Sequence, residues 1–390
     1  MNSDVLENNS GATRPHSMAG VKAGLRIIIA GGGTGGHIFP AIAIANALKK
    51  IEPGIEILFV GAKGKMEMEK VPQAGYTIKG IDIAGFDRSS LIKNIGLPFK
   101  LLKSFFQVRR IIKEFKPIAA IGVGGYSSFP VLRFAQAKGI TTFIHESNSF
   151  AGKSNILLGK KARAIFTATG NMTNFFPNEK IIVTGNPVRQ SIVRSRISRE
   201  AGILFFNLDP AKKTVLVTGG SLGARGINET IDKDLDQFEK NNIQLIWQTG
   251  KPYALKAMDR CAGKKYIWTG EFITQMEYAF AAADCAISRS GAMAIAELCV
   301  AGKPVVFVPF PFAAEDHQTV NAKTLVDLGA GLMVTDEAAK DKLVATVIGL
   351  VTNEEQKERL RKNISKLAVS NADEVIAGNV LTLIGRKMIN

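Results

Sequence analysis

The feature that most constrains the fold is a repeated alternation between short runs rich in β-branched residues and longer segments with helical periodicity. Such an alternation predicts parallel sheets whose strands are connected by helices on both faces. The expected strands form two series, 25–30, 55–60, 118–122, 141–145, 164–167 and 181–184, then 214–218, 243–248, 266–269, 285–288, 304–308 and 332–335. The sequence therefore predicts an α/β protein of two doubly wound, Rossmann-like domains that face a central cleft.

The length of 390 residues also favours two domains, because a single hydrophobic core rarely grows to that size. We expect a disordered tail or cloning remnant over residues 1–20, and an N-terminal domain over 21–190. A C-terminal domain over 191–372 and a final helix over 373–390, packing back toward the N-terminal domain, complete the expected organisation. The first 20 residues lack the apolar run of a secretory signal, and no apolar stretch is long enough to predict a membrane-spanning helix.

An excess of Lys and Arg, 50 against 34 Asp and Glu, gives a net charge of +16 and predicts an anionic partner. Nucleic acid, a phosphate-bearing substrate and an acidic membrane surface all fit this charge. Aromatic residues are only 7% of the chain, and neither an arginine-rich tract nor a zinc-finger spacing occurs. These observations argue against nucleic acid as the partner.

The first expected strand of each domain runs directly into a glycine-rich turn, at residues 31–36 and 219–223. The first turn matches G-x-G-x-x-G, but the acid that a dinucleotide fold places after its second strand is missing after Val60. In such turns the backbone approaches a ligand closely and the following helix directs free N–H groups at it, which suits phosphate. The alternative is that the glycines only allow tight packing of strand against helix.

A third strand-to-helix junction, at residues 288–297, places Glu297 about two helical turns beyond Gly291. There its carboxylate either accepts hydrogen bonds from a ribose diol or lies on a solvated helix face.

Several motifs follow one another in the order of a known family, at residues 32–37, 124–127, 145–148, 185–189, 219–221, 288–297 and 316–318. Together they resemble the MurG family of peptidoglycan N-acetylglucosaminyltransferases, over essentially residues 25–385. The resemblance implies a GT-B fold and an inverting transfer of N-acetylglucosamine from UDP-GlcNAc to the C4 hydroxyl of lipid I, the lipid-linked muramoyl-pentapeptide, forming lipid II. It also implies a peripheral enzyme at the cytoplasmic face of the bacterial inner membrane. Leu222 and Ser147 depart from the family, which often carries glutamine at both positions.

The resemblance further implies which residues bind the substrates. Arg189 and Ser221 would contact the diphosphate, the backbone at Ile273 the uracil, Glu297 the ribose and Gln318 the sugar hydroxyls. The full donor set is Thr34, Gly35, Gly36, Asn148, Arg189, Ser221, Ile273, Ala292, Met293, Ala294, Ile295, Ala296, Glu297 and Gln318. The acceptor set is Gly33, Gly125 and Tyr126, and no cofactor is implied.

Inverting transfer needs a general base, and His37 is the first candidate because it begins the helix after the first glycine turn. An imidazole there titrates near neutral pH, and the positive helix end favours its neutral form. Alternatively His37 binds phosphate or the turn backbone, and Glu146 is the competing base, with His145 structural. The acidic run from Asp232 to Asp236 resembles a metal motif, but it falls inside an expected helix, so we interpret it as a solvated charged face and predict no essential metal.

The segment 91–116 is the candidate for membrane contact, because its basic residues are opposed by the single acid Glu114. Its apolar residues recur at helical spacing, which predicts that most of that stripe faces the core of the protein. Lys100, Lys103 and Phe106 are expected to face an anionic bilayer surface and to support reversible attachment.

Three other functions remain open at this point. A UDP-N-acetylglucosamine 2-epimerase shares the architecture and the donor, but needs no basic apolar surface. A transferase that makes glycolipids from diacylglycerol is the nearest rival in chemistry. A two-domain binding protein is disfavoured by the absence of an export signal.

Overall fold

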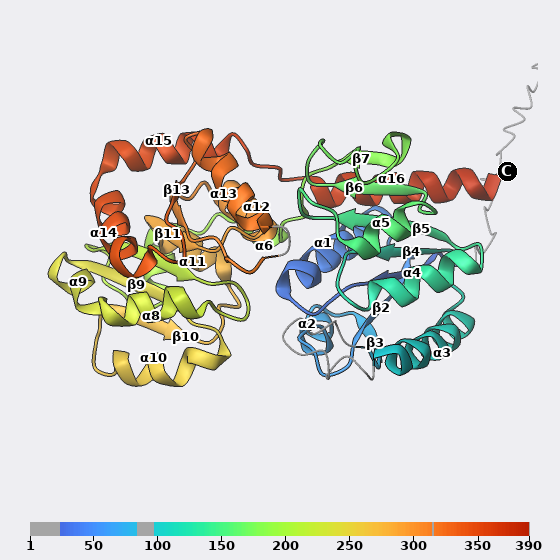
Figure 1. The fold of residues 1–390 in the computed structure, drawn as a ribbon, viewed down its shortest axis with the longest axis horizontal. Helices are drawn as coiled ribbons and strands as arrows, with labels where there is room; N and C mark the ends of the chain where they lie inside the picture. The colour runs from blue at the N-terminus through green and yellow to red at the C-terminus, as the bar shows by residue number, and fades with distance from the viewer. Residues whose placement is uncertain (1–23, 84–96, 314–315, 390) are drawn as a thin grey trace, which may run out of the picture.

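A computed structural model describes residues 24–83, 97–313 and 316–389 of the chain, so the expected tail over 1–20 and the start of the 91–116 segment lie outside the described residues. The described residues form two α/β domains side by side, which confirms the predicted fold class (Figure 1).

The first domain is built on a seven-stranded sheet in the order β3-β2-β1-β4-β5-β6-β7. Its strand pairs are parallel. The strands are β1 (Arg26–Ala30), β2 (Glu56–Ala62), β3 (Thr77–Ile81), β4 (Ala119–Gly122), β5 (Thr141–Glu146), β6 (Ala164–Thr167) and β7 (Ile181–Val183). The helices between them are α1 (Gly35–Ile51), α2 (Glu67–Gln73), α3 (Leu97–Phe115), α4 (Ser128–Ala137) and α5 (Lys153–Gly159).

The second domain repeats this plan with six parallel strands in the order β10-β9-β8-β11-β12-β13. The strands are β8 (Lys213–Thr218), β9 (Ile243–Gln248), β10 (Ile267–Gly270), β11 (Cys285–Ser288), β12 (Val305–Phe307) and β13 (Leu332–Met333). Its helices are α6 (Gln190–Val193), α7 (Arg199–Phe205), α8 (Arg225–Lys233), α9 (Leu235–Lys240), α10 (Ala254–Cys261), α11 (Met276–Ala282), α12 (Ala292–Ala301), α13 (His317–Asp327), α14 (Ala339–Thr352) and α15 (Glu354–Ser365).

The central strands are continuous apolar runs because helices cover both faces of each sheet. In β1, Ile27 and Ile29 pack into one core layer of the first domain and Ile28 into the other, and all three are fully buried. The strand pattern missed β3, because this edge strand mixes Lys79 and Gly80 with its apolar residues and is only partly buried.

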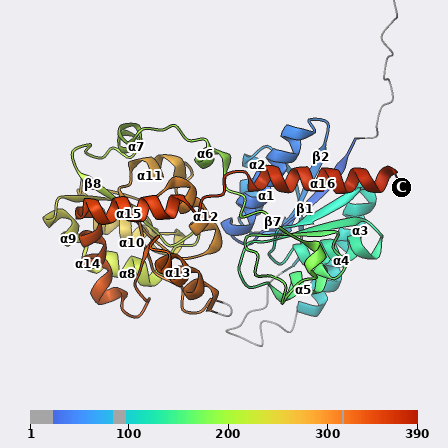
Figure 2. The same cartoon turned by 90° about the horizontal axis from the view of Figure 1, so that it is seen from above.

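The last helix, α16 (Ala372–Ile389), returns from the second domain and lies along α1 of the first (Figures 1 and 2). Its apolar side Ile376, Ala377, Val380 and Ile384 is buried in the core of the first domain. The Nζ of Lys50 on α1 lies 2.7 Å from the carboxylate of Glu374. The chain therefore crosses between the domains twice, once before and once after the second domain in the sequence.

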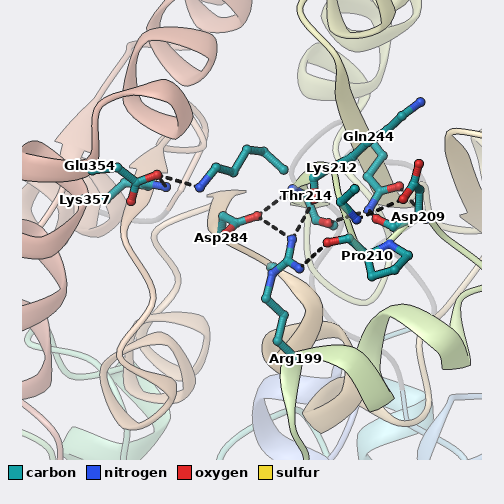
Figure 3. A network of polar contacts seen from close by, with 12 residues as sticks. Arg199, Asp209, Pro210, Lys212, Thr214, Gln244, Asp284, Glu354 and Lys357 are labelled. Atoms are coloured by element: carbon teal, nitrogen blue, oxygen red, sulfur yellow. Dashed lines mark hydrogen bonds and ion pairs between the residues drawn. The ribbon is translucent and has the colours of Figure 1, made fainter.

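A polar network ties together the amino-terminal ends of the strands in the second domain (Figure 3). The carboxylate of Asp284, just before β11, accepts the N–H of Thr214 at 2.7 Å and a guanidinium N–H of Arg199 at 3.3 Å. The side-chain amide of Gln244 donates to the Thr214 hydroxyl at 2.9 Å and to the carbonyl of Asp209 at 2.8 Å. This edge lies opposite the glycine turns, so it stabilises the sheet without contacting the candidate site.

We expect Asp284→Ala to lower the free energy of unfolding of the second domain by about 1–3 kcal/mol, because it leaves two donors without their acceptor. Both tryptophans, Trp247 and Trp268, lie in this domain, so urea unfolding followed by tryptophan fluorescence reports on it. Asp284→Asn, which keeps one acceptor oxygen, should lose less. The matched control is Asp259→Ala on the exposed side of α10. Equal midpoints for the Asp284→Ala and Asp259→Ala variants would contradict the assignment.

Candidate active site

A cavity of about 1010 Å³ lies between the two domains, where the carboxyl ends of both sheets meet. The first domain lines it with the start of α1 and with the loop after β5, and the second domain lines it with its glycine turn and the start of α12. The cavity brings together these residues predicted from the sequence: Thr34, Gly35, Gly36, His37, Asn148, Arg189, Ser221, Ala292, Met293, Ala294, Glu297 and Gln318. Leu222 and Ser147, the two departures from the family pattern, also line it.

Other predicted residues are not among the lining residues: Gly33, Gly125, Tyr126, Glu146, Ile273, Ile295 and Ala296. Ile295 and Ala296 turn toward the core on the other side of α12. Ile273 is buried, and its N–H donates to the side chain of Gln248 at 2.9 Å. Tyr126 is half exposed on the surface of the first domain.

Gln248, at the end of β9, stabilises the second glycine turn by a hydrogen bond. The amide of Gln248 donates to the carbonyl of Gly220 at 3.0 Å, and the hydroxyl of Thr218 accepts the N–H of Gly220 at 3.3 Å. Ser221 reaches across the cavity, and its hydroxyl oxygen lies 3.4 Å from the N–H of Gly35. The two glycine turns of the molecule therefore face each other.

Arg189 joins the two domains at the cavity wall. Its guanidinium donates two hydrogen bonds to the carboxylate of Glu297, at 2.9 and 3.1 Å, and both side chains are largely buried. The guanidinium also lies over the ring of Phe39 on α1, 4.4 Å from the ring centroid. Phe39 stacks in turn on Phe272 of the second domain. The sequence assigned Arg189 and Glu297 to separate parts of a ligand, and here they bind each other.

His37 is held in one orientation by the first glycine turn. Its Nδ1 lies 3.2 Å from the carbonyl of Gly32 and 3.4 Å from the hydroxyl of Thr34. When Nδ1 carries the proton and donates it to Gly32, the Nε2 atom keeps its lone pair. The ring packs against Gly124, where a Cβ atom would lie 2.6 Å from the imidazole and where φ is +93°. Only glycine fits at this position.

Burial lowers the pKa of His37 below its ordinary value, opposed by the nearby carboxylates of Glu146 and Glu67 and by the hydrogen bond to Gly32. From the sequence, the positive helix end was the expected cause of a lowered pKa at His37, whereas the main cause in the structure is loss of hydration. The consequence is the same, since a lowered pKa favours the neutral form of His37, which can accept a proton.

Glu146 is the less suitable base, because its carboxylate is already committed to the loop after β5. It is buried and accepts from the N–H and side chain of Asn148, the N–H of Gly152 and the side chain of Asn155, at 2.8–3.2 Å. His145, beside it on β5, is also buried, and burial lowers its pKa to about 4. Both residues build the loop that presents Asn148 to the cavity.

Sequence reasoning missed several residues of the cavity. Arg289 is buried and donates to the carbonyls of Val308 and Pro309 and to the carboxylate of Asp336. It thereby fixes the loop before Gln318, whose side chain accepts the N–H of Phe310. Asp336 lies 47 positions further along the chain than Arg289, so nothing in the local pattern indicates it.

The acidic run needs a correction, because Asp232 is not on a solvated face. Its carboxylate is largely buried and accepts from the Tyr253 hydroxyl at 2.6 Å, with Lys256 at 2.9 Å and Arg260 at 3.3 Å. These partners lie on or just before α10, which packs beside it. Within the described ranges, no cluster of three or more His, Cys, Asp or Glu side chains is arranged to hold a metal ion.

Comparisons with known proteins identify the family of the chain. The glycosyltransferase family 28 N-terminal domain matches residues 27–167, and the family 28 C-terminal domain matches residues 214–376. A UDP-N-acetylglucosamine–N-acetylmuramyl-(pentapeptide) pyrophosphoryl-undecaprenol N-acetylglucosamine transferase of Phocaeicola vulgatus is 52% identical over 92% of this chain and 96% of its own. Its namesake in Parabacteroides distasonis is 50% identical over 93% of this chain and 99% of its own.

Among solved structures, Acinetobacter baumannii MurG superimposes with a TM-score of 0.69 at 29% identity, covering 92% of this chain and 99% of its own. A UDP-GlcNAc 2-epimerase from Neisseria meningitidis, at 15% identity and a TM-score of 0.63, shares the fold alone. The family models and the level of identity together place the sequence: the chain belongs to glycosyltransferase family 28, among the MurG-type N-acetylglucosamine transferases.

Proposed function

We propose that the chain transfers N-acetylglucosamine from UDP-GlcNAc to the C4 hydroxyl of lipid I, forming lipid II with inversion at the sugar carbon. The observation that carries this proposal is the cavity, which His37 lines from the first domain. Arg189, Ser221 and Glu297 line the opposite side of the same cavity. The substrates named for the relatives of 50% identity and more support the same donor and acceptor.

The donor fits the second domain. The N-terminal end of α12 and the second glycine turn direct backbone N–H groups into the cavity, where they suit the diphosphate of UDP. Glu297 offers carboxylate oxygens to a ribose diol, and Gln318, held by the N–H of Phe310, offers its amide to the sugar hydroxyls. Arg189 then exchanges its contact with Glu297 for the diphosphate.

The acceptor hydroxyl approaches from the first domain, where Gly33 belongs to the first glycine turn, Gly125 packs against Gly32 of that turn, and Tyr126 follows Gly125. His37 Nε2 takes the proton of the C4 hydroxyl as its oxygen bonds to C1 of N-acetylglucosamine. The bond from C1 to the phosphate oxygen breaks, and UDP leaves with both electrons. Arg189, Ser221 and the N–H groups of the second turn stabilise the negative charge that develops on the diphosphate.

Incubation of the protein with radiolabelled UDP-GlcNAc and a soluble lipid I analogue tests the reaction. We expect labelled disaccharide product with one UDP released per sugar transferred. Without the acceptor analogue, UDP release should fall to the background of a protein-free mixture. Release of UDP with a free 2-epimer of the sugar, independent of the acceptor, would instead establish the epimerase.

The identity of the base is tested by pairing His37→Ala with Glu146→Gln. We expect His37→Ala to lower kcat by about 10²–10⁴-fold with the KM for UDP-GlcNAc nearly unchanged, because proton transfer is lost and His37 is not among the residues expected to bind the donor. The wild-type kcat should fall on the acid side with a midpoint below about 6.5, since burial lowers the pKa of His37 and only its neutral form accepts a proton. A larger loss of kcat in Glu146→Gln than in His37→Ala would assign the base to Glu146.

We further propose that α3 attaches the first domain to an anionic membrane surface, on the cytoplasmic face of the inner membrane. Val108 and Ile112 of α3 are buried in the core, whereas Phe99, Leu102 and Phe106 are 75%, 59% and 70% exposed. Basic residues accompany these exposed apolar side chains, although Lys103 also pairs with Asp82 at 3.1 Å. Figure 1 places α3 on the side of the first domain away from the second. No helix among the described residues has the length and apolar character needed to cross a bilayer.

Replacing Lys100, Lys103 and Phe106 together by serine should weaken sedimentation with anionic vesicles at least tenfold. Each basic residue near such a surface contributes about 1 kcal/mol, and the buried ring adds to this. Turnover of a soluble acceptor should stay within about twofold of wild type. The control replaces exposed Leu255 and Lys240 of the second domain by serine. Equal vesicle binding by the two variants would exclude α3 as the attachment surface.

A further inference from the structure

A carboxylate that the proposed mechanism does not use is enclosed beneath the first glycine turn. Glu67, the first residue of α2, is fully buried, and no cation of the described residues lies within ion-pair distance of it. Its Oε2 accepts the N–H of Gly33 at 2.8 Å, and its Oε1 accepts the N–H of Ala62, at the end of β2, at 2.9 Å. The first of these bonds occupies a backbone donor of the glycine turn that the sequence pattern predicts to bind phosphate.

The side chain of Glu67 fills the space in which a side chain at Gly32 or Gly61 would lie. A Cβ atom at Gly32 would lie 2.2 Å from Oε1, and one at Gly61 would lie 2.5 Å from the Cγ of Glu67. The acid that a dinucleotide fold places at the end of its second strand is absent here. Instead, the first residue of the next helix, Glu67, provides a carboxylate at this place, and that carboxylate binds the glycine turn of the protein itself. The second glycine turn differs, because no carboxylate of the described residues accepts a hydrogen bond from residues 219–223.

Glu67 and His37 bind opposite ends of one peptide group. The N–H of Gly33 and the carbonyl of Gly32 belong to the same planar peptide unit, so fixing the first fixes the direction of the second. The carboxylate accepts from the N–H, and the carbonyl accepts from His37 Nδ1. A hydrogen bond to a charged acceptor polarises the peptide and strengthens the carbonyl as an acceptor.

We propose that Glu67 is a positioning residue for His37, holding the Gly32–Gly33 peptide so that Nδ1 is protonated and Nε2 presents its lone pair to the cavity. The catalytic consequence rests on the proposed function, in which Nε2 accepts the proton of the acceptor hydroxyl. The orientation of His37 by Glu67 is a property of the protein without substrate.

The charged and titratable groups that face His37 come from two elements. Glu67 lies on α2, while His145 and Glu146 lie at the end of β5. The two carboxylates raise the pKa of His37 against the effect of burial, so removal of either charge should lower it further.

The test is Glu67→Gln, with Glu69→Gln on the exposed side of α2 as the matched control. Glutamine keeps the shape of the side chain, but its NH₂ group cannot accept from a backbone N–H, so one of the two turn contacts is lost. The whole chain is labelled with ¹³C and ¹⁵N in its four histidines, and His37→Asn assigns the His37 signals. Ring ¹⁵N shifts then report the tautomer, and the Cε1–H shift reports the titration.

For Glu67→Gln we expect a mixture of tautomers at His37 and a lower pKa for its ring. In Glu69→Gln, the tautomer and the pKa of His37 should match those of the wild type. With the lipid I analogue, kcat should fall at least tenfold while the KM for UDP-GlcNAc stays within about twofold. The acid limb of the kcat profile should move to lower pH. In a His37→Ala background, Glu67→Gln should cause no further loss of kcat.

His37 signals in Glu67→Gln that match those of Glu69→Gln would overturn the proposal, as would a full additional loss of kcat in the His37→Ala background. If Glu67→Gln does not fold, Glu67→Asp replaces it. Its carboxylate is one methylene too short to reach both N–H groups, so the tautomer should again be mixed, and an unchanged tautomer would be equally decisive. Absence of sugar transfer by the wild type would defeat the proposed function alone, because the NMR comparison needs no substrate.

Discussion

The guanidinium of Arg189 lies between the two domains, with the carboxylate of Glu297 on one side and the ring of Phe39 on the other. Arg189 directly follows the segment where the chain first crosses between domains, and Phe39 lies two residues beyond His37 on α1. A largely buried cation must keep an anionic partner, because an unpaired one costs several kcal/mol. The width of the cavity, and the distance from His37 to the second domain, therefore depend on this contact.

The same requirement explains how ligand binding is compatible with a paired Arg189 and Glu297. Under the proposed function, the diphosphate replaces the carboxylate as partner of Arg189, and the ribose hydroxyls replace the guanidinium as partners of Glu297. Neither charge is left unpaired in either state, so the exchange adds little to affinity by itself. Selectivity for the donor must therefore come mainly from contacts outside this pair, such as those with the second glycine turn.

Local patterns in the sequence were sufficient for every strand of the two sheets except the edge strand β3. Apolar strands ending in glycine are local signals, and they led to the two glycine turns and to His37, whereas the roles of Ser221 and Glu297 came from the family resemblance. Contacts between distant segments were not accessible in this way. Arg189 and Glu297 are 108 positions apart, and Glu67 resembles any surface glutamate of a short charged helix until its burial under Gly32 is known. Asp232 was misassigned to a solvated face for the same reason, since its partners are on or next to α10.

The two glycine turns share a pattern but create opposite electrostatic surroundings, and the proposed reaction needs both. When the acceptor proton reaches His37, a positive charge appears in the first domain, where the carboxylates of Glu67 and Glu146 stabilise it. At the same step a negative charge grows on the departing diphosphate, beside Arg189 and the N–H groups of the second turn. Fixed charges and dipoles arranged in advance lower the barrier because they need no reorganisation as the charges develop. A carboxylate under the second turn would repel the leaving group, and a cation under the first would weaken the base, so the duplicated fold has to be asymmetric at its turns.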